Sequence, residues 1–81
     1  MGIKDLPLDK GDRIYKVFEA LGFKYEGLSA KNHHILTNPN NPKFFISVPD
    51  HPEVDRYTLA AEIRKAGITA KAFRAKYEQM F

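Results

Sequence analysis

Three histidines supply the side chains of this 81-residue chain that change protonation near neutral pH: His33, His34 and His51. An imidazole with a pKa of about 6.5 is mostly neutral at cellular pH yet still accepts a proton, so it suits a general base. On a β-strand, adjacent side chains point to opposite faces. Only one of His33 and His34 can therefore face a given substrate, and the residue pattern alone does not say which.

Several other chemistries are not expected. His51 is expected in a loop, where it could donate a proton, contact a phosphate or stay solvated. We expect no metal site, because the side chains of His33 and His34 diverge and the histidines have no recognised ligand spacing. The chain has no cysteine, which excludes disulfides, thiolate zinc sites and a cysteine nucleophile. Neither Ser29 nor Ser47 lies in a Gly-x-Ser-x-Gly elbow, and the five glycines are not clustered as in a phosphate-binding loop.

Basic residues are unevenly distributed along the chain. There are 13 Lys and Arg against 10 Asp and Glu, a net charge of +3. Charges cancel over residues 1–30, whereas the stretch between Glu62 and Glu78 has no acid and contains Arg64, Lys65, Lys71, Arg74 and Lys76. Such a stretch attracts phosphates or forms a solvated helix face, and charge alone does not decide between them.

A first helix is predicted by apolar residues at i, i+3, i+4 and i+7. We expect Asp9 or Asp12 to cap it and Gly22 to end it, because glycine adopts positive φ without steric penalty. Its apolar stripe consists of Ile14, Val17, Phe18 and Leu21.

Two more helices are predicted near the end of the chain. The second should be capped by Asp55 or Thr58 and should stop at Gly67. Thr69 is expected to cap a short third helix, in which Phe73 and Tyr77 are spaced i, i+4.

Three strands are predicted between the first two helices by alternation of apolar and polar residues. The first strand begins at Phe23, the second covers residues 33–37 and the third covers residues 44–48. A turn at residues 38–42 joins the second strand to the third, which ends at Pro49. The order helix, three antiparallel strands, helix and short terminal helix indicates a two-layer α+β fold, with one sheet face free for a ligand.

The size of the chain indicates one domain, because 81 residues bury too little surface for two cores. We expect residues 1–8 to be a flexible N-terminal tail and residues 9–81 to form the domain. The longest apolar run, Phe44-Phe45-Ile46, is too short for a membrane helix, and no signal segment begins the chain. These features favour a cytoplasmic protein that does not contact a membrane.

Taken in order, the motifs resemble the HicA family of small bacterial toxins. The resemblance covers most of the chain, and the order of the motifs is more specific than any one of them. The motifs are Gly22-Phe23, Asn32-His33-His34-Ile35-Leu36, Ser47-Val48-Pro49-Asp50-His51, Thr58-Leu59 with Glu62-Ile63-Arg64-Lys65, and Ala66-Gly67-Ile68-Thr69 followed by Phe73.

The resemblance implies a fold like the double-stranded-RNA-binding domain, metal-independent cleavage of messenger RNA without a cofactor, and a HicB-like antitoxin as partner. Carried over residue by residue, it makes His33 the general base, on the open face with Ile35 and Thr37, and it turns His34 toward the helices. We add His51 as a possible accessory residue. The expected RNA-binding residues are Lys31, Asn32, Lys43, Arg64 and Lys65.

The chain departs from the family pattern just before His33, where Lys31-Asn32 replaces Gly-Ser. Lysine lacks the backbone freedom of glycine, although its charge attracts phosphate. The family's aromatic residue three places after the histidine is Leu36 here, which keeps burial but removes stacking. These departures leave open an alternative function, a catalytically silent module that binds RNA or protein.

Overall fold

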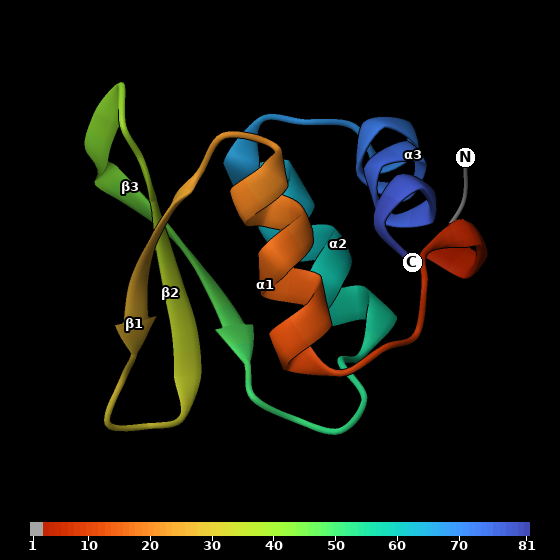
Figure 1. The fold of residues 1–81 in the computed structure, drawn as a ribbon, viewed down its shortest axis with the longest axis horizontal. Helices are drawn as coiled ribbons and strands as arrows, with labels where there is room; N and C mark the ends of the chain where they lie inside the picture. Colours follow the sequence, from red (N-terminus) through yellow and green to blue (C-terminus); the bar gives the residue numbers. More distant parts are fainter. Residues whose placement is uncertain (1–2) are drawn as a thin grey trace.

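The computed structural model describes residues 3–81 and places one helix before a three-stranded sheet and two helices after it (Figure 1). This confirms the expected α+β fold. Along the chain the elements are the 3-10 helix η1 (Ile3–Asp5), α1 (Gly11–Ala20), β1 (Lys24–Leu28), β2 (His33–Asn38), β3 (Asn41–Pro49), α2 (Arg56–Ala66) and α3 (Ala70–Met80).

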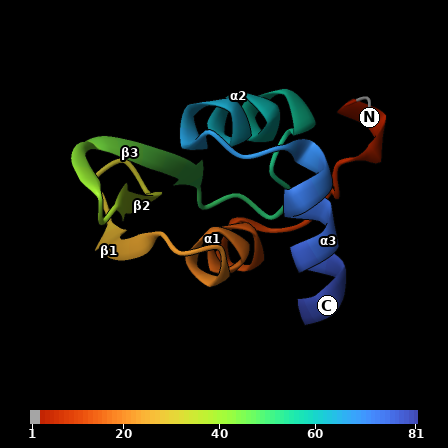
Figure 2. The same ribbon diagram turned by 90° about the horizontal axis from the view of Figure 1, so that it is seen from above.

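The helices lie on one side of the sheet (Figure 2). α1 and α2 pack against that side, while α3 lies beyond them, away from the strands. No element of residues 3–81 covers the opposite side, which we call the open face. The fold therefore leaves one sheet surface accessible, as a two-layer arrangement allows.

The strands pair in the order β1-β2-β3, and both pairs are antiparallel. Leu36 pairs with Ile46, and His34 pairs with Val48; all four side chains are buried on the helix side. Because side chains alternate along β2, His33 lies on the open face with Ile35 and Thr37. This is the grouping that the family resemblance implied.

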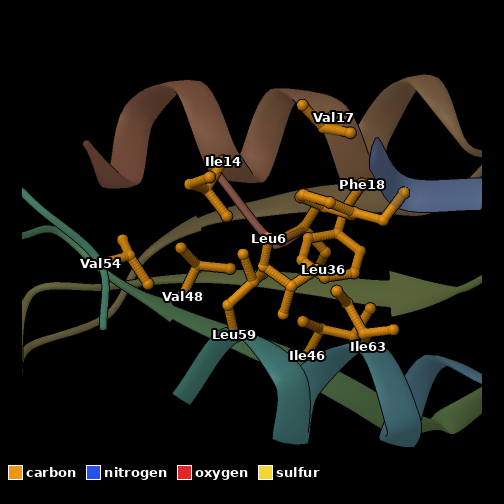
Figure 3. Close-up of a cluster of buried hydrophobic side chains, with 11 residues drawn as sticks. Leu6, Ile14, Val17, Phe18, Leu36, Ile46, Val48, Val54, Leu59 and Ile63 are labelled. Atoms are coloured by element: carbon orange, nitrogen blue, oxygen red, sulfur yellow. The ribbon is translucent and has the colours of Figure 1, made fainter. Parts of the chain in front are cut away.

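The apolar core lies between the sheet and the two covering helices (Figure 3). Each fully buried aliphatic or aromatic side chain contributes about 1.5–3 kcal/mol relative to exposure, so this cluster holds the inner face of β2 and β3 against the helices. Its members are Leu6, Ile14, Val17, Phe18, Leu36, Ile46, Val48, Val54, Leu59, Ile63 and Phe73.

Two of the three helix starts follow the prediction. Asp55 accepts from the Thr58 N–H at 3.1 Å and so caps α2, and Thr69 caps α3 through the Ala72 N–H at 3.0 Å. The expectation that Asp9 or Asp12 caps α1 is wrong: the cap is Lys10, which makes no side-chain capping bond. Asp9 instead accepts a hydrogen bond from α3, as described below.

The start of α1 is held against the end of β3. The Gly11 N–H donates to the His51 carbonyl at 2.9 Å. A Cβ at Gly11 would lie 2.2 Å from the Pro49 carbonyl oxygen, so only glycine allows this approach. The contact brings the loop after β3 beside the helix layer.

The ends of elements differ in detail from the prediction. Helix α2 ends at Gly67 as expected, with φ of 74°, whereas α1 ends at Ala20 with Leu21 as its C-cap, one residue before Gly22, whose φ is 106°. β1 starts one residue later than expected, at Lys24. The expected turn at residues 38–42 is too long: β2 extends to Asn38 and β3 starts at Asn41, because Asn38 pairs with Asn41 after a register shift at Thr37.

Residues 1–8 were expected to be a tail, and Met1 and Gly2 lie outside the described residues. Within this segment, residues 3–5 form η1, and Leu6 is 2% exposed in the core. The Leu6 carbonyl accepts from Arg56 Nε at 2.7 Å. The segment around Leu6 therefore packs on the domain. Across residues 3–81, no helix has the length and apolarity needed to cross a bilayer.

Candidate active site on the open face

His33 is the first residue of β2, and a tight turn holds its backbone. The Ser29 hydroxyl accepts from the His33 N–H at 3.2 Å, and the Ser29 N–H donates to the His33 carbonyl at 2.8 Å. The side chain is half-buried on the open face. The turn thus fixes where the imidazole leaves the sheet.

The turn before His33 accommodates the departure from the family pattern. Asn32 has φ of 61° and is the one non-glycine residue with positive φ in the described chain. Asparagine tolerates this left-handed conformation better than most residues. Lys31, at the family's glycine, does not have positive φ. The lysine therefore fits the turn without the backbone strain that its replacement of glycine suggested.

The imidazole of His33 is held by Ser47 of β3. His33 Nδ1 and Ser47 Oγ are 2.7 Å apart, a short side-chain hydrogen bond across the two strands. When Nδ1 carries the proton, it donates to Ser47, and Nε2 keeps the lone pair that a general base needs. The arrangement therefore suits proton abstraction by Nε2.

Ser47 is itself anchored to α2 by Glu62. The Ser47 N–H donates to Glu62 Oε1 at 2.8 Å, and Glu62 is 7% exposed. Lys65 Nζ lies 3.2 Å from Glu62 Oε2 and compensates the carboxylate. Because β3 is an edge strand, this N–H has no strand partner, and the carboxylate satisfies it.

Sequence reasoning did not assign a role to this pair. From the sequence, Ser47 is a rejected serine nucleophile and a motif residue, and Glu62 is a motif residue, with no role for either at the site. One signal was present: Glu62 lies directly before Ile63 and three residues after Leu59, both of which are buried. A carboxylate on that apolar face must have a partner, because an unpaired buried charge is costly.

His34 points the other way and joins four parts of the chain. It is 6% exposed; Nδ1 is 2.9 Å from the Tyr25 hydroxyl, and Nε2 is 3.0 Å from Asp50 Oδ1. Its ring stacks on Tyr15 of α1 at a centroid distance of 4.4 Å. Both hydrogen-bond partners of the ring are side chains. These contacts hold β1, β2, α1 and the loop after β3 together.

The Tyr25 hydroxyl in this cluster remains neutral well into the alkaline range. Burial raises the pKa of Tyr25, and the nearby Tyr15, Asp50 and Glu19 raise it further. A neutral phenol can share its hydroxyl with His34 without adding charge to the interior.

The other predicted residues near His33 come from the same end of the sheet. Lys31 and Asn32 are exposed in the turn, and the Asn32 carbonyl accepts from the Asp50 N–H at 2.9 Å. This bond brings the turn beside the loop that carries the exposed side chain of His51. Lys31 and Asn32 therefore lie in the turn next to His33, whereas the carbonyl of His51, on the adjacent loop, accepts from the Gly11 N–H at the start of α1.

The remaining predicted cations lie toward the other end. Lys43 is six residues from Pro49, the strand partner of His33, which corresponds to about 20 Å along β3. Arg64 and Lys65 belong to the last turn of α2, and Lys65 lies over the ring of Phe45. The predicted RNA-binding set is thus divided between the two ends of the sheet.

No group of three or more potential metal ligands occurs among residues 3–81. The side-chain contact of the His33 ring is with the Ser47 hydroxyl.

Comparison with models of protein families gives a match over residues 11–68, more than two-thirds of the chain, to the HicA toxin of bacterial toxin-antitoxin systems. The matched segment contains all three histidines, Ser47 and Glu62, and it ends before α3. No curated protein matches the chain.

Proposed function

The chain belongs to the HicA toxin family of bacterial toxin-antitoxin systems, and on this premise we propose that it is a metal-independent endoribonuclease that cleaves messenger RNA with His33 as general base. The observation that carries the proposal is the 2.7 Å bond between His33 Nδ1 and Ser47 Oγ on the open face. It orients an imidazole toward a surface that no described element covers.

RNA supplies its own nucleophile, the 2′-hydroxyl. His33 Nε2 takes the proton from this hydroxyl, the 2′-oxygen forms a bond to the adjacent phosphorus, and the bond from phosphorus to the 5′-oxygen breaks. The leaving oxygen then takes a proton from an acid. The products are a 2′,3′-cyclic phosphate and a 5′-hydroxyl end, and a base of this kind contributes about 10²–10⁴-fold to the rate.

Ser47 acts as a positioning residue in this step. It accepts the Nδ1 hydrogen in the neutral ring and keeps accepting it when Nε2 becomes protonated. Hydrogen bonds to charged groups are stronger than those to neutral ones. The bond therefore favours the imidazolium that forms as the 2′-hydroxyl loses its proton.

The turn before His33 holds the phosphate. Lys31 supplies a cation and Asn32 an amide donor, and both side chains are exposed in the turn that precedes His33. His51, on the adjacent loop, is the candidate for the acid that protonates the leaving oxygen. Lys43 of β3, with Arg64 and Lys65 of the last turn of α2, contacts phosphates of the RNA at the other end of the sheet.

The partner of the toxin is an antitoxin, as the family description states. We propose a HicB-like antitoxin that covers the open face and so separates His33 from RNA. This face carries the proposed catalytic group, and no element of residues 3–81 covers it, so an antitoxin that covers it would inactivate the toxin directly.

Substitution of His33 tests the proposal. His33→Ala should lower cleavage of a messenger RNA transcript by about 100-fold or more and should abolish growth arrest on expression. Thr37→Ala, on the same face of β2, is the matched control and should keep both. Far-ultraviolet circular dichroism confirms that both variants fold, and the cyclic phosphate end identifies the reaction.

Two outcomes would contradict the proposal. If His33→Ala cleaves RNA at the rate of the unchanged protein, His33 is not the base. If the unchanged protein binds RNA but leaves it intact under all conditions, the chain is the catalytically silent module that Lys31-Asn32 suggested.

A further inference from the structure

Phe45 is an exposed aromatic side chain on the same face as His33. It pairs with Thr37 of β2, and paired residues of antiparallel strands project to the same side of the sheet. The residue is 51% exposed and is not part of the apolar core. An aromatic ring left at the surface beside a proposed catalytic group favours a role in binding.

A lysine is held over this ring. Lys65 Nζ lies 5.1 Å from the centre of the Phe45 ring, within the range of a cation–π contact. The same ammonium is 3.2 Å from Glu62 Oε2, so it is anchored from both sides. Phe45 remains exposed with this positive charge over its ring, so the pair suits a nucleobase on the accessible surface of the ring and the phosphate attached to that base.

The distance from Phe45 to the proposed reaction centre suits a polynucleotide. Phe45 and Ser47 are two residues apart on β3, about 7 Å along the strand, and Ser47 holds the His33 ring. A strand with its scissile phosphate at His33 would thus place a neighbouring nucleotide at Phe45. The Glu62 carboxylate contacts both parts of this surface: it accepts from the Ser47 N–H next to His33, and it pairs with Lys65 next to Phe45.

We infer that Phe45 and Lys65 form a subsite that stacks one unpaired nucleobase next to the cleaved bond. The inference rests on the proposed ribonuclease function and specifies its substrate as RNA that is single-stranded at the cleavage position. Bases inside an A-form duplex are already stacked and paired, whereas unpaired bases can turn out and stack on aromatic side chains.

Binding measured without cleavage tests the subsite. In a His33→Ala background, Phe45→Ala should weaken binding of a fluorescent single-stranded oligoribonucleotide by about 5- to 100-fold. Phe45→Tyr keeps an aromatic ring and should bind within about twofold of the parent. Tyr57→Ala removes another exposed aromatic, on the first turn of α2, and should have no effect. A duplex of the same sequence should bind more weakly than the single strand.

The outcomes separate this inference from the proposed function. If Phe45→Ala binds single-stranded RNA as tightly as its parent while the protein with His33 cleaves RNA, the subsite is wrong and the nuclease stands. If the duplex binds more tightly, the substrate class is wrong. If Phe45→Ala weakens only antitoxin binding, the surface serves that protein. Absence of any RNA binding by the parent overturns the subsite and the nuclease together.

Discussion

At the scale of single residues, the chemistry of His33 depends on which ring nitrogen carries the proton. Ser47 Oγ contacts Nδ1, which leaves Nε2 for the substrate. The same histidine with its proton on Nε2 would be a hydrogen-bond donor there and would not serve as a base. If Ser47 accepts from Nδ1–H as proposed, a residue outside the histidine motif sets the tautomer in which the motif can act.

Ser47 variants test this dependence. Ser47→Ala should lower kcat for RNA cleavage by about 10- to 100-fold, because a hydrogen bond to a charged group is worth about 1.5–3 kcal/mol. Ser47→Thr keeps a hydroxyl and should restore most of the rate. Nitrogen-15 chemical shifts of the His33 ring should show Nδ1 protonated in the unchanged protein and a tautomer mixture in Ser47→Ala.

A purely structural role for Ser47 gives a different pattern. In that case Ser47→Ala would lower the folding stability without changing the His33 tautomer or the pH profile of kcat. The ring nitrogens of His34, held by Tyr25 and Asp50, provide an internal reference that should not shift.

The turn before His33 illustrates why a residue type alone can mislead. Lys31 looked unfavourable because it replaces glycine, but the backbone places positive φ at Asn32 instead. The position of a left-handed residue depends on the hydrogen bonds of the whole turn, here those that Ser29 makes with His33 and Lys31. Motif comparison cannot reveal those bonds.

At the scale of elements, a polar contact joins α3 to the residue before α1. The Tyr77 hydroxyl donates to Asp9 Oδ2 at 2.7 Å, and Arg13 Nη1 is 3.5 Å from the same oxygen. Burial raises the pKa of Asp9, but the bonds from Tyr77 and the Lys10 N–H, with the charge of Arg13, outweigh it, so the pKa lies below its ordinary value. The hydrogen bond to Asp9, then burial and the charge of Asp9, raise the pKa of Tyr77.

These two shifts predict stability losses at both extremes of pH. A lowered carboxyl pKa gives stability that is present above about pH 4 and is lost as the pH falls through the folded-state value. A raised phenol pKa gives stability that is lost as the pH rises above about 10. Tyr77→Phe should reduce the free energy of unfolding at pH 7 by about 1 kcal/mol. It should also make the stability less dependent on pH in both the acidic and the alkaline range.

Urea unfolding at several pH values measures this effect. Arg74→Ala serves as the control, because it removes the exposed ion pairs of Arg74 with Glu78 and Asp5. This variant should still lose folding stability at alkaline pH. If Tyr77→Phe has the same pH profile as the unchanged protein, the Tyr77–Asp9 contact does not contribute to it.

At the scale of the whole molecule, the covering helices separate the proposed RNA-binding surface from the basic residues of α3. Lys43 belongs to β3, whereas Lys71 belongs to α3, on the far side of the covering helices from the sheet (Figure 2). The net charge of +3 is small, so its arrangement matters more than its size. RNA binding should depend on the cations of the sheet side.

Salt dependence tests this arrangement. The logarithm of RNA affinity should fall linearly with the logarithm of salt concentration, and each lost phosphate contact should reduce the slope by about 0.7 for single-stranded RNA. Lys43→Ala should reduce the slope by about that amount, and Lys71→Ala should not. Equal effects of the two substitutions would mean that RNA binds through general charge rather than through the open face.

The sequence by itself determined the elements, their order and most of their ends, because helix and strand periods and capping residues such as Asp55, Thr69 and Gly67 act locally. Only the tertiary structure decided that Glu62 holds Ser47, that Ser47 holds His33, and that Tyr77 rather than a helix end engages Asp9. These contacts join residues far apart in the chain. They depend on strand register and on the packing of helices against an edge strand, which no local pattern encodes.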